Sequence, residues 1–174
     1  MTDVFTQTDL DAALASCARD IICRQGDFYF AGHPSGRSTP VRATDTAAVI
    51  ASGAATVDAD GAAFVLAADS AVVHAADSAV VHAADSAAAY GHGHADLFAY
   101  DDATVYAYDD ATVYASGNAI VHAYDDATVH ASGNAIAYAY DDATVYASGN
   151  ATVHGAEHGI VGHVEAHTYR GGDR

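Results

Sequence analysis

The feature that most constrains this chain is an eight-residue repeat whose frame is never broken. From Ala67 the chain reads AADSAVVH, AADSAVVH, AADSAAAY, GHGHADLF, AYDDATVY, AYDDATVY, ASGNAIVH, AYDDATVH, ASGNAIAY, AYDDATVY and ASGNATVH, ending at His154. The same frame extends backward to Ala43 and, much degraded, forward to Arg170. Sixteen octads therefore cover 128 of the 174 residues, and the sequence predicts a repeat architecture.

The pattern inside each octad predicts short β-strands separated by turns. The first, fifth and seventh positions are almost always Ala, Ala and Val, whereas the second, sixth and eighth positions vary. Because side chains alternate along a strand, the small residues share one face, which we expect to point inward. The third and fourth positions are Asp-Ser, Asp-Asp or Gly-Asn, which are turn formers. A helix does not fit, because eight residues are poorly commensurate with a 3.6-residue turn. We expect an all-β parallel solenoid.

Chemically equal turns recur every sixteen residues rather than every eight. From Ala107 onward, octads that begin AYDD alternate strictly with octads that begin ASGN. We therefore expect a two-sided coil of two octads, with Asp-Asp turns on one edge (109–110, 125–126 and 141–142) and Gly-Asn turns on the other (117–118, 133–134 and 149–150). Eight coils about 4.8 Å apart would form a flat rod roughly 38 Å long. The main alternative, a three-sided coil of three octads, would mix both turn types along every edge.

The residues before the octads predict a cap. Thr8-Asp9-Leu10-Asp11 has the form of a capping box with Asp in place of Glu, and Leu10, Ala13, Leu14 and Cys17 then fall on one helical face. The segment 20–30 follows as strand, glycine turn and strand. We divide the chain into a cap at 1–42, a solenoid at 43–154, and degenerate repeats with a polar tail at 155–174 that we expect to form a partial cap.

These segments carry two resemblances. The helix followed by a strand pair resembles, over about 25 residues, the start of pectate-lyase-like right-handed β-helix proteins. The octads are similar, over most of the chain, to the Gly-Asn-Ala-Thr-Val repeats of bacterial and phage-encoded β-solenoids. The first resemblance implies a right-handed coil. It implies no enzymatic activity, because the catalytic acid and base clusters of the pectate-lyase family have no counterpart that can be placed here.

Composition and charge restrict the partners. The chain is 51% hydrophobic without any tryptophan, and most of the apolar residues are Ala and Val, so the interior must be thin. Acidic residues number 23 against six basic ones, all six are Arg, and none lies between 43 and 169. Direct binding to nucleic acid or to anionic lipid needs cationic side chains and is therefore disfavoured. We expect a neutral or basic protein partner, or a homo-oligomer.

Segments that would direct the chain to a membrane or out of the cell are not evident. No apolar stretch reaches the ~20 residues of a membrane span, and Met1-Thr2-Asp3-Val4 lacks the basic and apolar regions of a signal peptide. We expect a cytoplasmic protein unless another route exports it. The two cysteines, Cys17 and Cys23, are interpreted as reduced core residues, because two thiols do not make a disulfide framework.

Eleven histidines invite a metal hypothesis. Five of them occupy the eighth octad position, where two histidines of one ladder would lie at least about 9.6 Å apart, too far to share an ion. His92 and His94, and a C-terminal group, remain as candidates; the members of that group are His154, His158, His163 and His167. The C-terminal spacing is not the HExxH of zinc proteases. We predict no metal site, while leaving binding by the C-terminal group open.

The remaining chemical motifs do not predict an enzyme. Paired aspartates could attract calcium weakly, but the calcium-binding β-roll repeat has nine residues and GGxGxD glycines, so we interpret these pairs as solvated turns. No GxSxG elbow and no glycine-rich phosphate loop before a helix occurs. We therefore expect no catalytic residue and no cofactor.

The outer faces are unusually rich in aromatic residues. In the two-sided coil we expect one flat interaction face formed by nine residues: Tyr108, Thr112, Tyr114, Tyr124, Thr128, His130, Tyr140, Thr144 and Tyr146. Cross-strand aromatic and Thr pairs stabilise a sheet by about 0.2–1 kcal/mol each, so these ladders could simply hold the rod together. Tyrosine is also favoured in protein interfaces, which makes recognition or self-association an equal alternative.

Three functions follow from the sequence. The leading one is a non-enzymatic β-solenoid, a rigid rod whose flat faces or ends mediate self-assembly or docking to a partner. The second is an acidic inhibitor or immunity-type protein that imitates the charge of nucleic acid and blocks a basic groove. The third is ice binding, because flat Thr-bearing faces can order water; Tyr and His interrupt the regular Thr array that this function would need.

Overall fold

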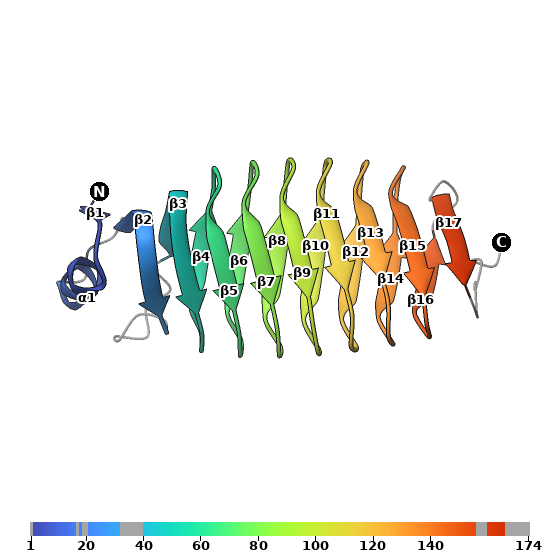
Figure 1. Ribbon diagram of the computed structural model, residues 1–174, viewed down its shortest axis with the longest axis horizontal. Coiled ribbons are helices and arrows are strands. Elements are labelled where there is room, and N and C mark those ends of the chain that lie inside the picture. Colours follow the sequence, from blue (N-terminus) through green and yellow to red (C-terminus); the bar gives the residue numbers. More distant parts are fainter. Residues whose placement is uncertain (1, 17, 19–20, 32–39, 156–159, 166–174) are drawn as a thin grey trace.

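The computed structural model describes residues 2–16, 18, 21–31, 40–155 and, for the backbone alone, 160–165. It is a parallel β-solenoid of about nine turns that forms a long narrow rod (Figure 1). Each strand pairs with the strands one full coil before and after it, so that Thr104 lies opposite Ile120 and opposite Ala88, sixteen residues away in either direction. The predicted two-sided coil is therefore confirmed, and the three-sided alternative is wrong.

The strands alternate between the two sides of the rod. One side consists of β4 (Thr56–Ala59), β6 (Val72–Ala75), β8 (Ala88–Gly91), β10 (Thr104–Ala107), β12 (Ile120–Ala123), β14 (Ile136–Ala139) and β16 (Thr152–Gly155). The other side consists of β5 (Phe64–Ala67), β7 (Val80–Ala83), β9 (Asp96–Ala99), β11 (Thr112–Ala115), β13 (Thr128–Ala131), β15 (Thr144–Ser148) and β17 (Ile160–Glu165). We call their outer surfaces the even face and the odd face.

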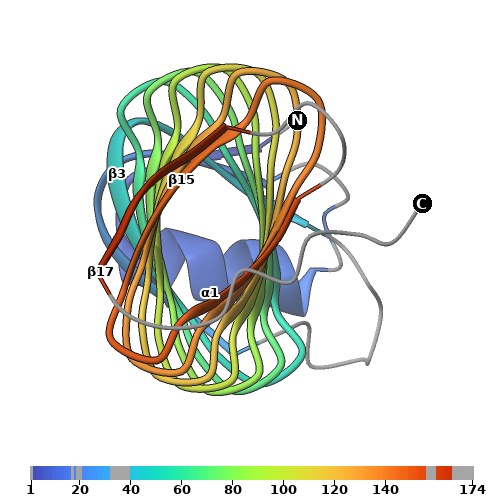
Figure 2. The same ribbon diagram turned by 90° about the vertical axis from the view of Figure 1, so that its right-hand side faces the viewer.

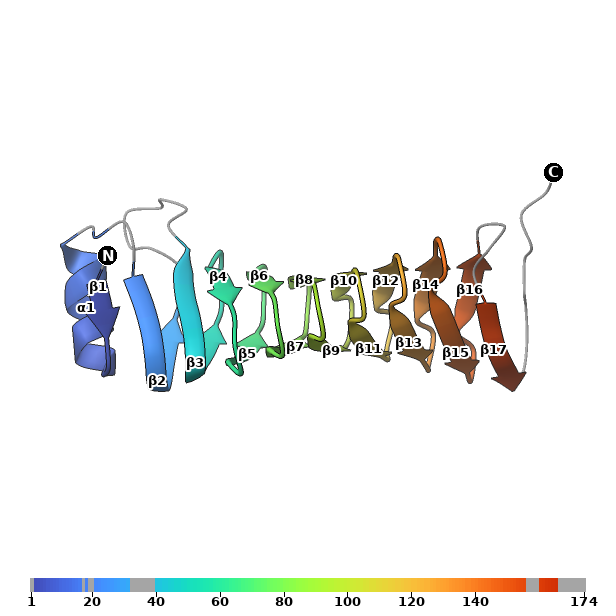
Figure 3. The same ribbon diagram turned by 90° about the horizontal axis from the view of Figure 1, so that it is seen from above.

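The coil is right-handed. In Figure 1 the odd-numbered strands run down the near side while the chain advances from the N-terminal to the C-terminal end, and the even-numbered strands return up the far side. Figure 3 shows the two sides separated, and Figure 2, seen along the rod, shows the coils in nearly the same outline one behind another. This agrees with the handedness that the resemblance implied.

Two kinds of turn form the two edges of the rod. Turns that lead from even to odd strands form the tyrosine edge, which includes 92–94, 108–110, 124–126 and 140–142. Turns that lead from odd to even strands form the serine edge, which includes 100–102, 116–118, 132–134 and 148–150. The predicted separation of Asp-Asp from Gly-Asn turns is thus observed from residue 107 onward.

The middle residue of each turn, at the third octad position, adopts a left-handed backbone that Asp and Gly tolerate. Asp109 has φ 55° and Gly117 has φ 70°. The carboxylate of Asp125 accepts a hydrogen bond from the backbone N–H of Asp109 at 3.3 Å, and Asp109 accepts one from Gly93 at 3.1 Å. On the serine edge the side-chain amides connect the coils instead, since Asn150 donates to Asn134 at 3.4 Å. Successive turns are therefore joined along both edges.

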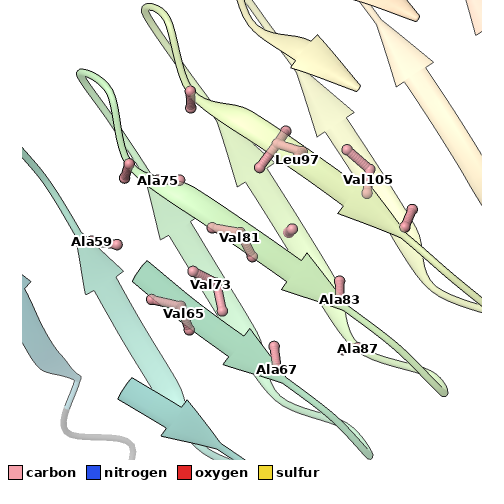
Figure 4. Close-up of a cluster of buried hydrophobic side chains, with 14 of the residues drawn as sticks. Ala59, Val65, Ala67, Val73, Ala75, Val81, Ala83, Ala87, Leu97 and Val105 are labelled. Atoms are coloured by element: carbon pink, nitrogen blue, oxygen red, sulfur yellow. The ribbon is translucent and has the colours of Figure 1, made fainter. Parts of the chain in front are cut away.

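The core is a thin double layer of Ala and Val (Figure 4). Val105, Val113 and their neighbours at the same octad position are fully buried, as are nearly all alanines at the first and fifth positions. One coil departs from this rule, because Leu97 stands where Val is usual. Gly91 compensates for the larger side chain, since a Cβ atom at this position would collide with Cδ1 of Leu97. The inward face is as predicted.

The N-terminal end is closed by a helix. Helix α1 (Gln7–Ala15) covers the end of the rod (Figure 3) and buries Leu10, Ala13 and Leu14, as predicted. The capping box is not where the sequence suggested. Thr6 is the N-cap and Asp9 its reciprocal partner, because Thr6 precedes the first turn and its side chain accepts from the N–H of Asp9 at 3.2 Å. Cys17 lies outside the described residues.

The first two coils also differ from prediction. A short strand β1 (Thr2–Val4) pairs with the start of β2 (Ile21–Phe30), and β2 pairs along its length with β3 (Val41–Ala51). The expected strand, glycine turn and strand is thus one continuous strand with a register shift between Cys23 and Gln25. The residue pairs across the two strands are twenty or more positions apart, so the octad frame starts only at β3. Cys23 is free and buried, and burial raises the pKa of its thiol to about 12.

Candidate functional site

Three columns of stacked aromatic rings run along the rod. The even column consists of His74, Tyr90, Tyr106, His122, Tyr138 and His154, with ring centroids 4.8 to 4.9 Å apart. The odd column consists of His82, Phe98, Tyr114, His130 and Tyr146, at 4.4 to 5.0 Å. The edge column consists of His92, Tyr108, Tyr124 and Tyr140, at 4.7 to 4.9 Å. Neighbouring rings are nearly parallel and cover one another's faces, so solvent meets ring edges.

The structure divides the nine predicted interface residues between two surfaces. The pairs Thr112 with Tyr114, Thr128 with His130 and Thr144 with Tyr146 lie in register on the odd face, as expected. The edge column lies beside the even column instead, because the ring of Tyr140 is 6.4 Å from that of His122. The pKa of Tyr124 agrees with this placement: burial raises it, and so do, more weakly, Tyr140, Tyr108 and Tyr106, the last of which belongs to the even column. The single flat face expected from the sequence is therefore incorrect.

The odd face has a groove where the even face has the edge column. The second octad position is Tyr on the tyrosine edge but Ser on the serine edge in the C-terminal half of the rod. A groove of about 430 Å³ results beside the odd column. Its lining is Tyr100, Tyr114, Ala115, Ser116, His130, Ala131, Ser132, Tyr146, Ala147 and Ser148. It crosses β11, β13 and β15.

Exposure of equivalent residues shows that this space is open. Tyr114 and Tyr146 of the odd column are 42% and 45% exposed, whereas Tyr106 and Tyr138 of the even column are only partly exposed. The alanines beneath follow the same rule: Ala115, Ala131 and Ala147 are 2 to 4% exposed, while Ala107, Ala123 and Ala139 are fully covered. The odd column therefore forms a ridge beside a floor of alanine.

Tyr100 closes the groove at its N-terminal end. It occupies the same octad position and edge as Ser116, but its ring lies over His82 at 6.0 Å and its hydroxyl is 3.5 Å from Nδ1 of that histidine. Neither Tyr100 nor the serines of this edge were among the interface residues expected from the sequence. The change from Tyr100 to Ser116 is visible in the repeat. It predicts a groove only when the face on which the side chains of this edge lie is also known.

The groove offers hydroxyl groups and the imidazole of His130 as polar groups. The hydroxyl of Ser132 donates to the backbone carbonyl of Ala115 at 3.2 Å. No Ser–His hydrogen bond is found among the described residues of the groove. The surface can bind an aromatic or apolar group on the Ala floor and offer hydroxyl groups around it.

Clusters of ionisable side chains would be a second kind of site, because they can bind metal ions. In the described ranges no three side chains of His, Cys, Asp or Glu come together in a way that could hold an ion. His92 and His94 each lie 3.8 Å from an aspartate of the next coil, Asp109 and Asp110, and form pairs only. Of the C-terminal histidines, the side chains of His158, His163 and His167 lie outside the described residues. Whether this group binds a metal ion is therefore not tested by the structure.

The threonines form a short single row. Thr112, Thr128 and Thr144 lie in register on adjacent strands of the odd face. In the preceding coil the same register position is Asp96. This row is three coils long and one residue wide, which gives limited support to the ice-binding interpretation.

Among the described residues, no helix is long and apolar enough to cross a bilayer. No protein-family model matches this chain, and no curated protein or solved structure was found to be similar to it.

Proposed function

We propose that this protein is a non-enzymatic rod that docks another protein through the ridge and groove of the odd face. The observation that carries the proposal is the asymmetry between the two faces. On the even face, the tyrosines of the edge column fill the space beside the even column. On the odd face, the equivalent space beside Ser116, Ser132 and Ser148 is open.

The energetics favour a rigid docking surface. Ring stacking along the columns and hydrogen bonds along both edges hold the groove in one shape, so binding orders few of its side chains. Tyrosine ring edges beside an apolar floor suit aromatic side chains, which contribute about 0.5–1.5 kcal/mol per ring pair beyond area burial. A second copy or a different protein could supply such side chains.

The test fills the groove with the residue that the rod uses on its other side. Ser132→Tyr should place a ring in the groove, since Tyr100 shows that this edge accepts tyrosine. Ala68→Tyr makes the same change on the same edge, two coils before Tyr100, and serves as the control. Light scattering coupled to size-exclusion chromatography at low and high salt would measure the mass of each protein.

The outcomes separate self-association from other docking. A defined multimer at both salt concentrations, lost in Ser132→Tyr and kept in Ala68→Tyr, would support docking of a second copy through the groove. A multimer that is indifferent to Ser132→Tyr would contradict the proposal. A monomer under all conditions would exclude self-association and direct the search to neutral or basic partners.

Charge density favours a second candidate, the imitation of nucleic acid. Residues 43–154 carry fifteen aspartates and no Lys or Arg. These seven coils span about 34 Å, so one carboxylate occurs per roughly 2.2 Å of rod, compared with about one charge per 1.7 Å of duplex DNA. A basic cleft built for a duplex would meet a comparable field.

Competition tests this candidate. The rod should displace a labelled DNA duplex from a basic, sequence-non-specific DNA-binding protein, and displacement should weaken steeply as salt rises. Retention of the duplex at low salt, with the rod in large excess, would contradict it. Ice binding is tested separately, because only that function predicts thermal hysteresis in dilute protein.

A further inference from the structure

The groove opens close to where the described chain ends. Strand β17 lies beside β15 at the C-terminal end of the rod (Figure 1), and the backbone of Glu165 pairs with Ser148, which lines the groove. The described chain therefore ends at Glu165 on the serine edge, one strand spacing of about 4.8 Å from the groove.

The segment that follows has the composition that this surface would select. Residues 166–174 read Ala-His-Thr-Tyr-Arg-Gly-Gly-Asp-Arg. Tyr169 is aromatic, and Arg170 and Arg174 are the only cationic Lys or Arg side chains after Arg42. The groove has an alanine floor and tyrosine ring edges that suit an aromatic side chain, and the rod around it is strongly acidic. On its serine edge the exposed turn residues Asp101 and Asp102 directly follow Tyr100 at the closed end.

The distances allow the segment to reach the whole groove. Four residues beyond Glu165, Tyr169 can lie up to about 13 Å away, which reaches Ser132 two coils back. Asp101 and Asp102 follow β9, four coils before β17 and thus about 19 Å away. Nine residues can span about 30 Å, so Arg174 can reach these carboxylates after the chain has turned.

We propose that residues 166–174 fold back along the serine edge and place Tyr169 in the groove, with the arginines directed toward Asp101 and Asp102. This inference rests on the proposed docking function, because the segment then occupies the docking site of the free protein. The even face gives the structural precedent, since Tyr108, Tyr124 and Tyr140 fill the equivalent space there. Covalent attachment supplies an effective concentration in the millimolar range, so a weak contact is sufficient.

The absence of tryptophan from the sequence provides a direct reporter. In a Tyr169→Trp protein all tryptophan fluorescence comes from this segment. We expect blue-shifted emission and protection from acrylamide quenching. Adding Ser132→Tyr should fill the groove and return the emission to that of an exposed tryptophan, whereas adding Ala68→Tyr should leave it unchanged.

Each outcome is decisive. Exposed emission from Tyr169→Trp alone would overturn the proposal, and so would blue-shifted emission that persists with Ser132→Tyr, because the segment would then dock elsewhere. High salt should reduce the protection, because it screens the attraction between the arginines and the carboxylates of Asp101 and Asp102. Arg170→Asp combined with Arg174→Asp should do the same at low salt.

A second measurement separates this inference from the docking function. A chain ending at Glu165 should bind its second copy or partner about tenfold more tightly, because no segment has to be displaced. A protected tryptophan together with a truncated chain that stays monomeric and binds nothing would uphold the fold-back and contradict the docking function. An exposed tryptophan, together with association that Ser132→Tyr abolishes, would uphold the docking function and contradict the fold-back.

Discussion

At the scale of single residues, the core shows how closely size is matched in a thin interior. Within the described part of the rod, every coil but one places Val or Ala at the seventh octad position of its strands, and the exception, Leu97, coincides with a glycine in place of alanine at Gly91. In a core only two side chains deep, no neighbour can move away to accept one more methyl group. The two substitutions therefore act as one.

A double-mutant cycle tests this coupling. Gly91→Ala should lower the free energy of unfolding by about 1–3 kcal/mol, because the added methyl group collides with Leu97. Leu97→Val alone should cost roughly 0.5–1.5 kcal/mol for the lost methylene group. The double variant should be more stable than Gly91→Ala, as measured by urea denaturation. Simple additivity of the two costs would show that the residues are not in contact.

At the scale of the strand, the inside and outside positions differ sharply in what they tolerate. Val129 on β13 is fully buried, and Asp126 in the preceding turn is exposed. Val129→Asp should lower the free energy of unfolding by several kcal/mol and unfold the rod, because it buries an unpaired carboxylate in the apolar core. Asp126→Asn should change stability by less than about 0.5 kcal/mol, since Asn already occupies this position at Asn118 and Asn134. Thermal melting by circular dichroism compares them, and equal melting temperatures would refute the assignment of faces.

The repeat made the strands and edges predictable, whereas the cap and groove depended on packing. Alternation of Ala and Val located the core, and the spacing of equal turns established two sides. The start of α1 was misplaced because Thr6 and Thr8 both precede an acidic residue by a few positions and only the fold selects between them. The edge column was assigned to the wrong side because a residue at a corner can lie against either face. The groove arises from a missing side chain beside Tyr114, which no motif records.

At the scale of the whole molecule, α1 makes the two ends of the rod unequal. Its apolar side covers the first coil, so growth by stacking rods end to end is blocked at that end. Leu10 is fully buried against the coil. Leu10→Asp should detach the helix and expose strand edges, and rods should then associate with rising concentration. Negative-stain electron microscopy should show particles longer than one rod; single rods alone would indicate that the helix is not what prevents stacking.

The identical spacing of the coils also bears on how such a chain can change over generations. The octads AYDDATVY at 107–114 and AYDDATVH at 123–130 lie sixteen residues apart and differ only in their last residue, so recombination between them can add or remove one coil without disturbing the frame. A duplicated pair of octads that includes an ASGN turn would lengthen the rod by about 4.8 Å and, by the same step, lengthen the groove. The length of the rod and the length of the groove would then change together in steps of one coil, while the residues that line each coil stay the same.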